Sequence, residues 1–242
     1  MNVAPNAATL PPPVRRPEAR RGPPRPKSRP DGGRPTPAEL RAAGDLPGGT
    51  RMTGAAFDDY HPVNRCELVD GRLSYLPMPR SRHALLCTHV LLRLHHALLA
   101  AGYAEDEVAL AGSDNRLRVG PDRHREPDVS LLLDGASPAI RPEHWTTADL
   151  CVEVVSPDDP DRDHDDKRGD YAAAGVREYW IADPRPATDD DPRGESVTVL
   201  TLAGGGYTER VFRAGEAAAG PLLPAFTLDV AAFLRVGLPA PS

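Results

Sequence analysis

The sequence predicts an α/β (α+β) domain with a mixed central sheet that is flanked by helices and extended by β-hairpins. Apolar residues recur at three- and four-residue steps from Ser81 to about Ala101, which is typical of an amphipathic helix, and Gly102 ends the pattern. Residues 150–155 form an almost continuous apolar run, which indicates a strand buried on both faces. Asp70-Gly71 separates two alternating runs within residues 65–76, which predicts a hairpin.

The other expected elements follow from shorter runs of the same kinds. We expect strands at 107–111, 115–119, 128–133 and 178–182, a second hairpin at 196–202 and 207–212, a loop running into a helix at 158–171, and a closing helix at 228–234. Residues 178–184 contain Tyr179 and Trp180, and because large side chains are scarce in this chain we expect them to fill the core.

The first 51 residues differ in composition from the rest of the 242-residue chain. Residues 1–50 contain 12 of the 28 prolines, nine Lys+Arg, four Asp+Glu and no aromatic residue. Such a segment buries too little apolar surface to offset the entropy of ordering it. We therefore expect residues 1–51 to be a disordered tail and residues 52–242 to form one domain. Met52 lies at the junction, and translation from Met52 is the alternative to a start at Met1.

Composition also narrows the class of protein. No apolar stretch is long enough to cross a membrane, and no apolar run follows the N-terminus as in a secretory signal. Three cysteines without C-x-x-C spacing argue against a disulfide framework and a zinc knuckle. These features predict a reduced, cytoplasmic protein with no membrane partner. Residues 51–242 carry a net charge of −11, which is unusual for a protein that binds nucleic acid by charge alone.

Two carboxylates stand out because of the strands on which they lie. Asp128 follows Pro127 at the start of an apolar strand, a position where an acid is often structural. Glu153 interrupts the buried run 150–155, where an ionised carboxylate costs several kcal/mol unless it is paired or binds a metal. A buried Glu–Arg pair and a functional site are equally good interpretations of Glu153.

Lys167 is the only lysine among the 20 basic residues of the range 51–242. It lies in the acidic run 161–171, four residues after Asp163, so an ordinary surface ion pair is one interpretation. However, this run directly follows the strand that carries Glu153, and a helix starting there could return the lysine toward the end of the strand. His164 suits a general base by residue type, but a histidine in a solvated acidic run is usually a surface residue.

Asp128, Glu153 and Lys167 together suit phosphodiester hydrolysis. Two carboxylates on neighbouring strands can hold a hard divalent cation. Such a cation lowers the pKa of a bound water and neutralises charge that develops on a phosphate, and a nearby ammonium assists the attack.

Residues 57–235 resemble the Uma2 or DUF820 family of restriction-endonuclease-like proteins, within the PD-(D/E)xK nuclease superfamily. The matching motifs are Glu67-Leu-Val-Asp70-Gly71, Pro127-Asp128-Val129, Val152-Glu153-Val154-Val155-Ser156-Pro157, Asp165-Asp166-Lys167 and the stretch from Tyr171 to Pro184. The last stretch is the most specific of them.

The resemblance implies a restriction-endonuclease-like fold, Mg²⁺ or Mn²⁺ as the metal, and a role for each matching residue. Asp128 and Glu153 would be the two metal-binding acids, and the carbonyl of Val154 a further metal ligand. The superfamily pattern has a lysine two residues after the second acid, where this chain has Val155. Lys167 occupies the position to which the family's lysine has moved. Glu67 corresponds to an acid that supplies an extra metal contact.

Three functions remain open from the sequence. The first is a Mg²⁺-dependent endonuclease that acts on DNA, which could approach through a patch formed by Arg116, Arg118, Arg123 and Arg125. The second is an inactive interaction module of the same fold, which Val155, the acidity and the lack of a recognition domain favour. The third is a metal-dependent hydrolase with another substrate. The orientation of Lys167 discriminates between the first two. The fold often goes with homodimers, but the sequence specifies neither an interface, nor a recognition site, nor DNA over RNA.

Overall fold

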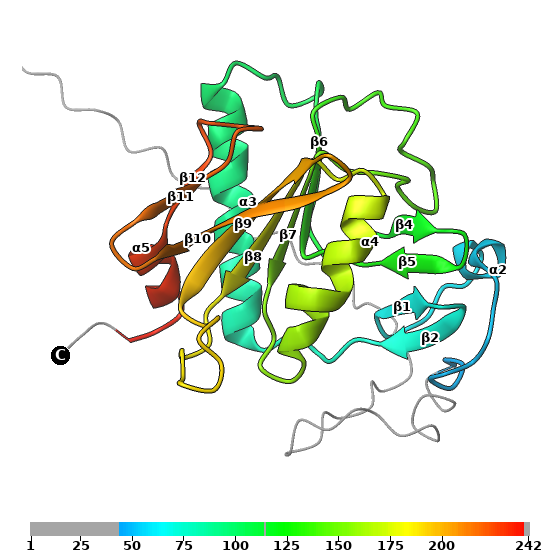
Figure 1. The fold of residues 1–242 in the computed structure, drawn as a ribbon. Coiled ribbons are helices and arrows are strands. Elements are labelled where there is room, and N and C mark those ends of the chain that lie inside the picture. The colour runs from blue at the N-terminus through cyan, green and yellow to red at the C-terminus, as the bar shows by residue number, and fades with distance from the viewer. Residues whose placement is uncertain (1–43, 114, 240–242) are drawn as a thin grey trace, which may run out of the picture.

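A six-stranded sheet forms the centre of the computed structural model, which describes residues 44–113 and 115–239 (Figure 1). Its strand order is β10-β9-β8-β7-β6-β3. Only β7 and β8 run parallel, and the other neighbours are antiparallel, so the sheet is mixed as predicted. The strands are β3 (Ala109–Ala111), β6 (Val129–Leu132), β7 (Leu150–Val154), β8 (Glu178–Asp183), β9 (Ser196–Ala203) and β10 (Gly206–Arg213).

Helices cover both faces of this sheet. Even-numbered residues of β7 face α3 (Ser81–Ala100) and α5 (Val230–Arg235) in one apolar cluster. The odd-numbered residues Cys151 and Val155 pack in a second cluster with Tyr171 of α4 (Lys167–Ala173). Strand residues alternate between faces, so Glu153 lies on the α4 side. A π-helical turn, η1 (Arg162–Asp166), precedes α4.

A smaller antiparallel sheet of order β2-β1-β5-β4 stands beside the large one (Figure 1). Its strands are β1 (Cys66–Val69), β2 (Arg72–Tyr75), β4 (Leu117–Gly120) and β5 (Arg123–Arg125). The predicted hairpin is confirmed: β1 pairs with β2, and Asp70 and Gly71 adopt the positive φ angles of the turn. A short helix, α2 (Gly54–Asp58), adjoins this sheet, and β11 (Ala217–Ala219) with β12 (Thr227–Asp229) forms a third, two-stranded sheet.

The prediction of the fold class is confirmed, but two details differ. β5 was not predicted, because its residues pair with charged partners and show no apolar alternation. The closing helix begins at Val230 instead of residue 228, since 227–229 pair with β11 and Asp229 caps the helix by accepting from the N–H of Ala232. Tyr179 and Trp180 are buried in the core as expected.

Only one side of the acidic run 161–171 is solvated, which corrects the interpretation of several of its charged residues as surface residues. Asp163, His164, Lys167 and Asp170 are all buried. His164 lies 3.0 Å from Asp183 Oδ2, and the Tyr179 hydroxyl donates to the carbonyl of Asp163. These contacts turn one side of η1 and α4 toward the sheet.

The packed part of the chain begins before Met52. Asp45 is buried and accepts hydrogen bonds from the N–H groups of Val63 and Asn64, and the Tyr75 hydroxyl donates to the carbonyl of Leu46. A chain that began at Met52 would lack these contacts. Residues 1–43, most of the predicted tail, lie outside the described residues. Across 44–113 and 115–239, no helix combines the length and apolarity needed to span a membrane.

Asp183 fastens η1 to the end of β8. It is fully buried, and besides His164 it accepts from both Nε and Nη2 of Arg185. Burial alone would raise its pKa, but the hydrogen bonds from His164 and Arg185 hold the pKa below its ordinary value of 3.8. A lowered folded-state pKa stabilises the protein above the unfolded-state pKa, and this contribution disappears as the pH falls through the folded-state value.

We therefore expect Asp183→Asn to lower the free energy of unfolding by about 1.5–3 kcal/mol at pH 7, because charge-assisted hydrogen bonds are lost. Below pH 3.8 the difference between the variant and the parent should shrink. Urea unfolding at the two pH values measures both effects, with the exposed Asp190→Asn as control. An equal loss at both pH values would contradict the assigned role.

Arg125 joins the small sheet to α4. Its Nη1 donates to Glu67 Oε2 at 2.8 Å and its Nε to Asp170 Oδ2 at 2.7 Å, and the arginine is only 2% exposed. If the guanidinium is removed, both buried carboxylates lose a cationic partner, and Glu67 keeps only the more distant Lys167 ammonium at 3.8 Å.

Arg125→Met should therefore lower the free energy of unfolding by about 3–5 kcal/mol. The matched control is Arg177→Met, which removes an exposed ion pair with Asp149 and should cost about 0–1 kcal/mol. Denaturant unfolding of both variants tests this. Similar losses in the two variants would show that the buried network contributes little.

Candidate functional site

A cavity of about 270 Å³ lies at the carboxyl ends of the parallel strands β7 and β8, between the start of α3 and η1. Asp128, Glu153 and Lys167 all line it. They come from three different segments, the residue before β6, the middle of β7 and the first residue of α4. The fold thus brings together three residues that the sequence separates by up to 39 positions.

Asp128 is held by the backbone of the neighbouring strand. Its Oδ2 accepts from the N–H of Val154 at 2.9 Å and lies 3.2 Å from His83 Nε2. Burial alone would raise its pKa, but the hydrogen bond and charge of His83 outweigh this and lower it. Asp128 is therefore an ionised carboxylate at one wall of the cavity.

Glu153 is buried and carries two contacts on a single oxygen. Oε1 accepts from the Tyr171 hydroxyl at 2.6 Å and lies 2.8 Å from Lys167 Nζ. Burial raises the pKa of Glu153 to about 8, against the opposing effect of Lys167, and Asp128 and Asp163 add to the rise. The sequence alternative of a Glu–Arg pair is not what the structure shows, because the cation beside Glu153 is a lysine.

Lys167 points into the protein and contacts three carboxylates. Its Nζ lies 2.8 Å from Glu153, 3.0 Å from Asp163 Oδ1 and 3.8 Å from Glu67 Oε1. The pairing with Asp163 exists as the i,i+4 spacing predicts, but it is buried in the cavity wall, not on the surface. Burial alone would lower the pKa of Lys167, and the charges of Asp163 and Glu153 more than reverse this, so the ammonium stays protonated.

Glu67 lies behind Lys167 and is not among the cavity-lining residues. It is completely buried in β1, where Oε2 accepts from Arg125 and Oε1 accepts from the N–H of Glu126 at 3.2 Å. Burial would raise its pKa, but Lys167 and Arg125 outweigh this and lower it. Within the described residues, three carboxylates (Glu67, Glu153 and Asp163) lie within 4 Å of one ammonium, and Arg125 pairs with Glu67.

Sequence reasoning missed His83, Asp163 and Tyr171 as parts of this site. His83 lies in the helix that begins at Ser81, and the four histidines of that helix do not form a metal-binding pair on one helix face. The structure places His83 Nε2 3.0 Å from the carbonyl of Val154 and its Nδ1 3.4 Å from Cys87 Sγ. The available signals were the spacings of four residues, His83 to Cys87 and Lys167 to Tyr171, each of which places two side chains on one helix face.

The arginines before Asp128 do not form the expected DNA-facing patch, which corrects that hypothesis. Arg116 donates to the carbonyls of Phe57 and Tyr60, and Arg125 is buried against Glu67 and Asp170. Arg123 pairs with Asp70 and Asp170, and Arg118 lies near Asp58. These arginines hold the small sheet together.

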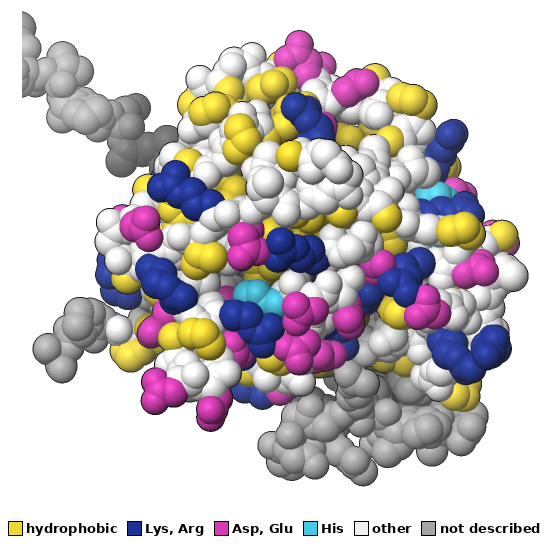
Figure 2. All heavy atoms as spheres, viewed as in Figure 1, with side chains coloured by type: hydrophobic (Ala, Val, Ile, Leu, Met, Phe, Trp, Pro, Cys, Tyr) yellow, Lys and Arg dark blue, Asp and Glu magenta, His cyan; other side chains and the backbone are white. Residues whose placement is uncertain are grey.

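Different arginines line the cavity itself, namely Arg65, Arg80, Arg82, Arg162 and Arg185. They occur beside acids, for example Arg80 near Asp158 and Arg162 near Asp159. Figure 2 shows the same mixture of arginines and acids over the face that carries α4. Most of the arginine charge at the cavity is therefore paired with carboxylates of the protein itself.

A crystal structure of a "putative nuclease belonging to DUF820" from Anabaena variabilis is similar to this chain. The match has a TM-score of 0.59 and 17% sequence identity, and it covers 76% of this chain and 99% of that one. At this identity the likeness shows the fold alone. No curated protein matches the chain. The model of the Uma2 family, described as "Putative restriction endonuclease", matches residues 56–231, which is more than half of the chain. The chain therefore belongs to the Uma2 family.

Proposed function

We propose that the protein is a metal-dependent endonuclease that hydrolyses phosphodiester bonds of DNA, with Asp128, Glu153 and Lys167 as its catalytic residues. The observation that carries this proposal is their convergence on one cavity, with Lys167 Nζ 2.8 Å from Glu153. The family described above is consistent with nuclease chemistry.

The cavity wall suits a hard divalent cation such as Mg²⁺ or Mn²⁺. Asp128, Glu153 and the carbonyl of Val154 offer oxygen atoms, the ligands that such cations prefer. His83 Nε2 already lies within 3.2 Å of both Asp128 Oδ2 and the Val154 carbonyl, so positive charge is favourable between these atoms. When bound, the cation supplies a nucleophilic water at neutral pH and neutralises charge on the phosphate.

The remaining residues hold the site in shape and position charge. Lys167 stays protonated, so it cannot accept a proton from water, and its role is to donate hydrogen bonds to phosphate oxygens. Asp163 and Tyr171 are positioning residues, because Asp163 holds the ammonium and the Tyr171 hydroxyl orients Glu153. The arginines that line the cavity favour a polyanionic substrate.

The interaction module remains the second candidate, and one observation favours it. Val155, where the superfamily pattern has its lysine, is packed in an apolar cluster with Tyr171 and Ile181. In addition, Oε1 of Glu153 is already contacted by the Tyr171 hydroxyl and by Lys167 Nζ, so this oxygen is stabilised without a metal. The two candidates differ in whether the carboxylates bind metal.

We expect calorimetry to detect Mg²⁺ or Mn²⁺ binding to the full chain. Asp128→Asn and Glu153→Gln should each weaken it by roughly 100-fold or more, because each removes a charged oxygen ligand. The matched controls are Asp165→Asn and Glu209→Gln, whose side chains are 69% and 48% exposed. Both controls should bind the metal as the parent does. No binding in the parent, with or without DNA, would favour the interaction module.

We also expect the parent to cleave DNA in Mg²⁺ and to stop when the metal is chelated. Lys167→Met should reduce the cleavage rate by about 10²–10³-fold, because a charged hydrogen-bond donor to the phosphate is lost. Metal affinity should not fall in this variant, since both acids remain.

The neighbouring Arg168→Met, which removes an exposed cation paired with Glu209, is the control and should cleave normally. Far-UV circular dichroism must show that Lys167→Met is folded. If this folded variant cleaves as fast as the parent, Lys167 has no catalytic role. An RNA substrate of the same sequence tests the preference for DNA.

A further inference from the structure

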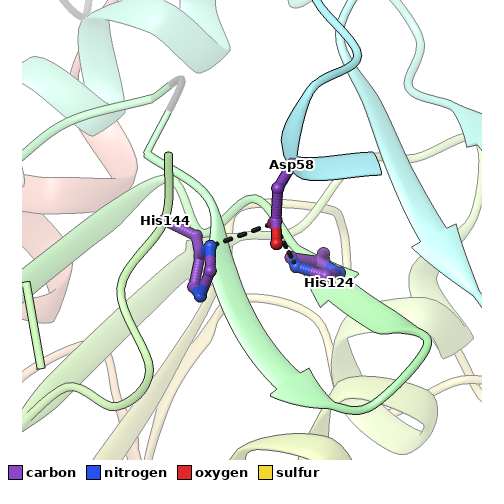
Figure 3. A group of neighbouring side chains, drawn as sticks. All are labelled: Asp58, His124 and His144. Carbon is purple, nitrogen blue, oxygen red and sulfur yellow. Dashed lines mark hydrogen bonds and ion pairs between the residues drawn. The ribbon is translucent and has the colours of Figure 1, made fainter. Parts of the chain in front are cut away.

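A second cluster of metal-ligand side chains lies outside the cavity, between α2, β5 and the segment that joins β6 to β7 (Figure 3). Asp58 Oδ1 lies 3.0 Å from His124 Nε2 and 2.9 Å from His144 Nδ1. One ligand atom from each residue lies within 4.8 Å of the others. The side chains of His124 and His144 are 0% and 8% exposed, and that of Asp58 is 16% exposed.

Hydrogen bonding alone does not account for the approach of His144 to Asp58. Although the two atoms are 2.9 Å apart, His144 Nδ1 is a buried atom that makes no hydrogen bond within the described residues. The other nitrogen of His124, Nδ1, also has no partner there. Two electron-rich atoms that converge without an aligned N–H between them are stabilised by a cation placed where their lone pairs meet.

The local chain is built to hold Asp58 in this place. A Cβ on Gly54 would come within 2.1 Å of the carbonyl oxygen of Pro121, so only glycine allows α2 to pack this close to the β4–β5 turn. The N–H of Gly54 donates to Asp122, and the Phe57 ring packs on His124 with centroids 5.0 Å apart. These contacts fix α2 on the small sheet without any metal.

The side chain of Asp58 is oriented so that its two oxygens face different groups. Arg118 Nη1 lies 4.0 Å from Oδ2 of Asp58, so the guanidinium faces one oxygen and the rings face the other. The two imidazole rings stand at 90° to each other with centroids 5.4 Å apart. A charged group that faces the second oxygen of a metal-binding carboxylate, as Arg118 does here, is a regular feature of protein metal sites.

We propose that Asp58, His124 and His144 bind a divalent metal ion, Zn²⁺. Two imidazoles and one carboxylate are a ligand set that zinc takes, and the partly exposed Asp58 leaves room for water as the fourth ligand. The oxygen-rich cavity, in contrast, suits Mg²⁺ or Mn²⁺. Bound zinc ties residues 58, 124 and 144 together and so fastens α2 and the β6–β7 segment to the small sheet. This proposal does not depend on nuclease activity.

The test is a titration of the metal-stripped full chain with Zn²⁺ alone, followed by calorimetry and thermal unfolding. We expect one high-affinity zinc per chain and a rise in Tm, because an ion that binds only the folded state stabilises it. Asp58→Asn and His144→Gln should each weaken the binding by about 10–100-fold or more and remove the rise in Tm. His96→Gln changes an exposed histidine and should leave both unchanged.

His83, Cys87 and Asp128 at the cavity are a second group of side chains that could bind zinc. The variant His83→Gln distinguishes zinc binding there from zinc binding at Asp58, His124 and His144. Zinc binding that disappears in His83→Gln and survives in Asp58→Asn and His144→Gln would overturn the proposal, and so would a parent that binds no zinc. If a variant fails to fold, X-ray absorption by the parent loaded with Co²⁺ identifies the atoms that bind the metal. X-ray absorption with two imidazole nitrogens and no sulfur supports the site, whereas a Co–S contact places the metal beside Cys87 and overturns it.

Discussion

The ammonium of Lys167 is the charge on which the rest of this site depends. It is buried among the carboxylates of Glu67, Glu153 and Asp163, which come from β1, β7 and η1. Each of these groups alone would be strongly disfavoured in the protein interior, and together they compensate one another. The lysine thus defines where the large sheet, the small sheet and the π-helical turn meet. A lysine suits this role because its compact ammonium can contact several carboxylates from different directions.

The negative charge around Lys167 still exceeds the positive charge, and this imbalance links structure to chemistry. Glu153 has a pKa of about 8 because burial and neighbouring carboxylates disfavour its ionised form. A cavity with surplus carboxylate oxygens is stabilised by protons or by a cation. The same surplus that would weaken a purely structural core is what a metal-dependent hydrolase requires. In the proposed enzyme, stability and function are therefore in opposition at Glu153, whose Oε1 is contacted by Tyr171 and Lys167.

Local patterns in the sequence predict the elements well, and long-range charge pairing explains what they miss. The hairpin at 65–76 and the helix from Ser81 depend on turn chemistry and apolar periodicity, which are visible in short windows. β5 depends on Arg125 meeting Glu67, 58 residues away, and on Asp170, 45 residues away, which no local pattern records.

In the candidate site, too, local sequence patterns indicate some residues, whereas long-range charge pairs explain the others. Glu153 and Lys167 could be singled out because a lone acid in an apolar strand and a lone lysine are unusual, whereas Asp128 is singled out by the resemblance to the Uma2 family. Charge runs are usually solvated, which favours a surface position for the acidic run 161–171. His164 and Lys167 of this run are nevertheless buried, because their partners Asp183 and Glu67 lie on β8 and β1. The arginine patch was wrong for a related reason, since neighbouring arginines in sequence need not share a face. Arg116 and Arg125 are directed to partners inside the protein.

β5 connects the two clusters of functional side chains. His124 and Arg125 are consecutive, and consecutive strand residues point to opposite faces. His124 faces Asp58 and His144, while Arg125 contacts Glu67, which lies 3.8 Å from Lys167. A displacement of β5 therefore moves both clusters at once. If zinc fixes His124, it also fixes the backbone that carries Arg125 and, through Glu67, limits the positions open to the Lys167 ammonium. The short strand that sequence patterns did not predict is therefore the mechanical link between the proposed zinc site and the proposed nuclease site.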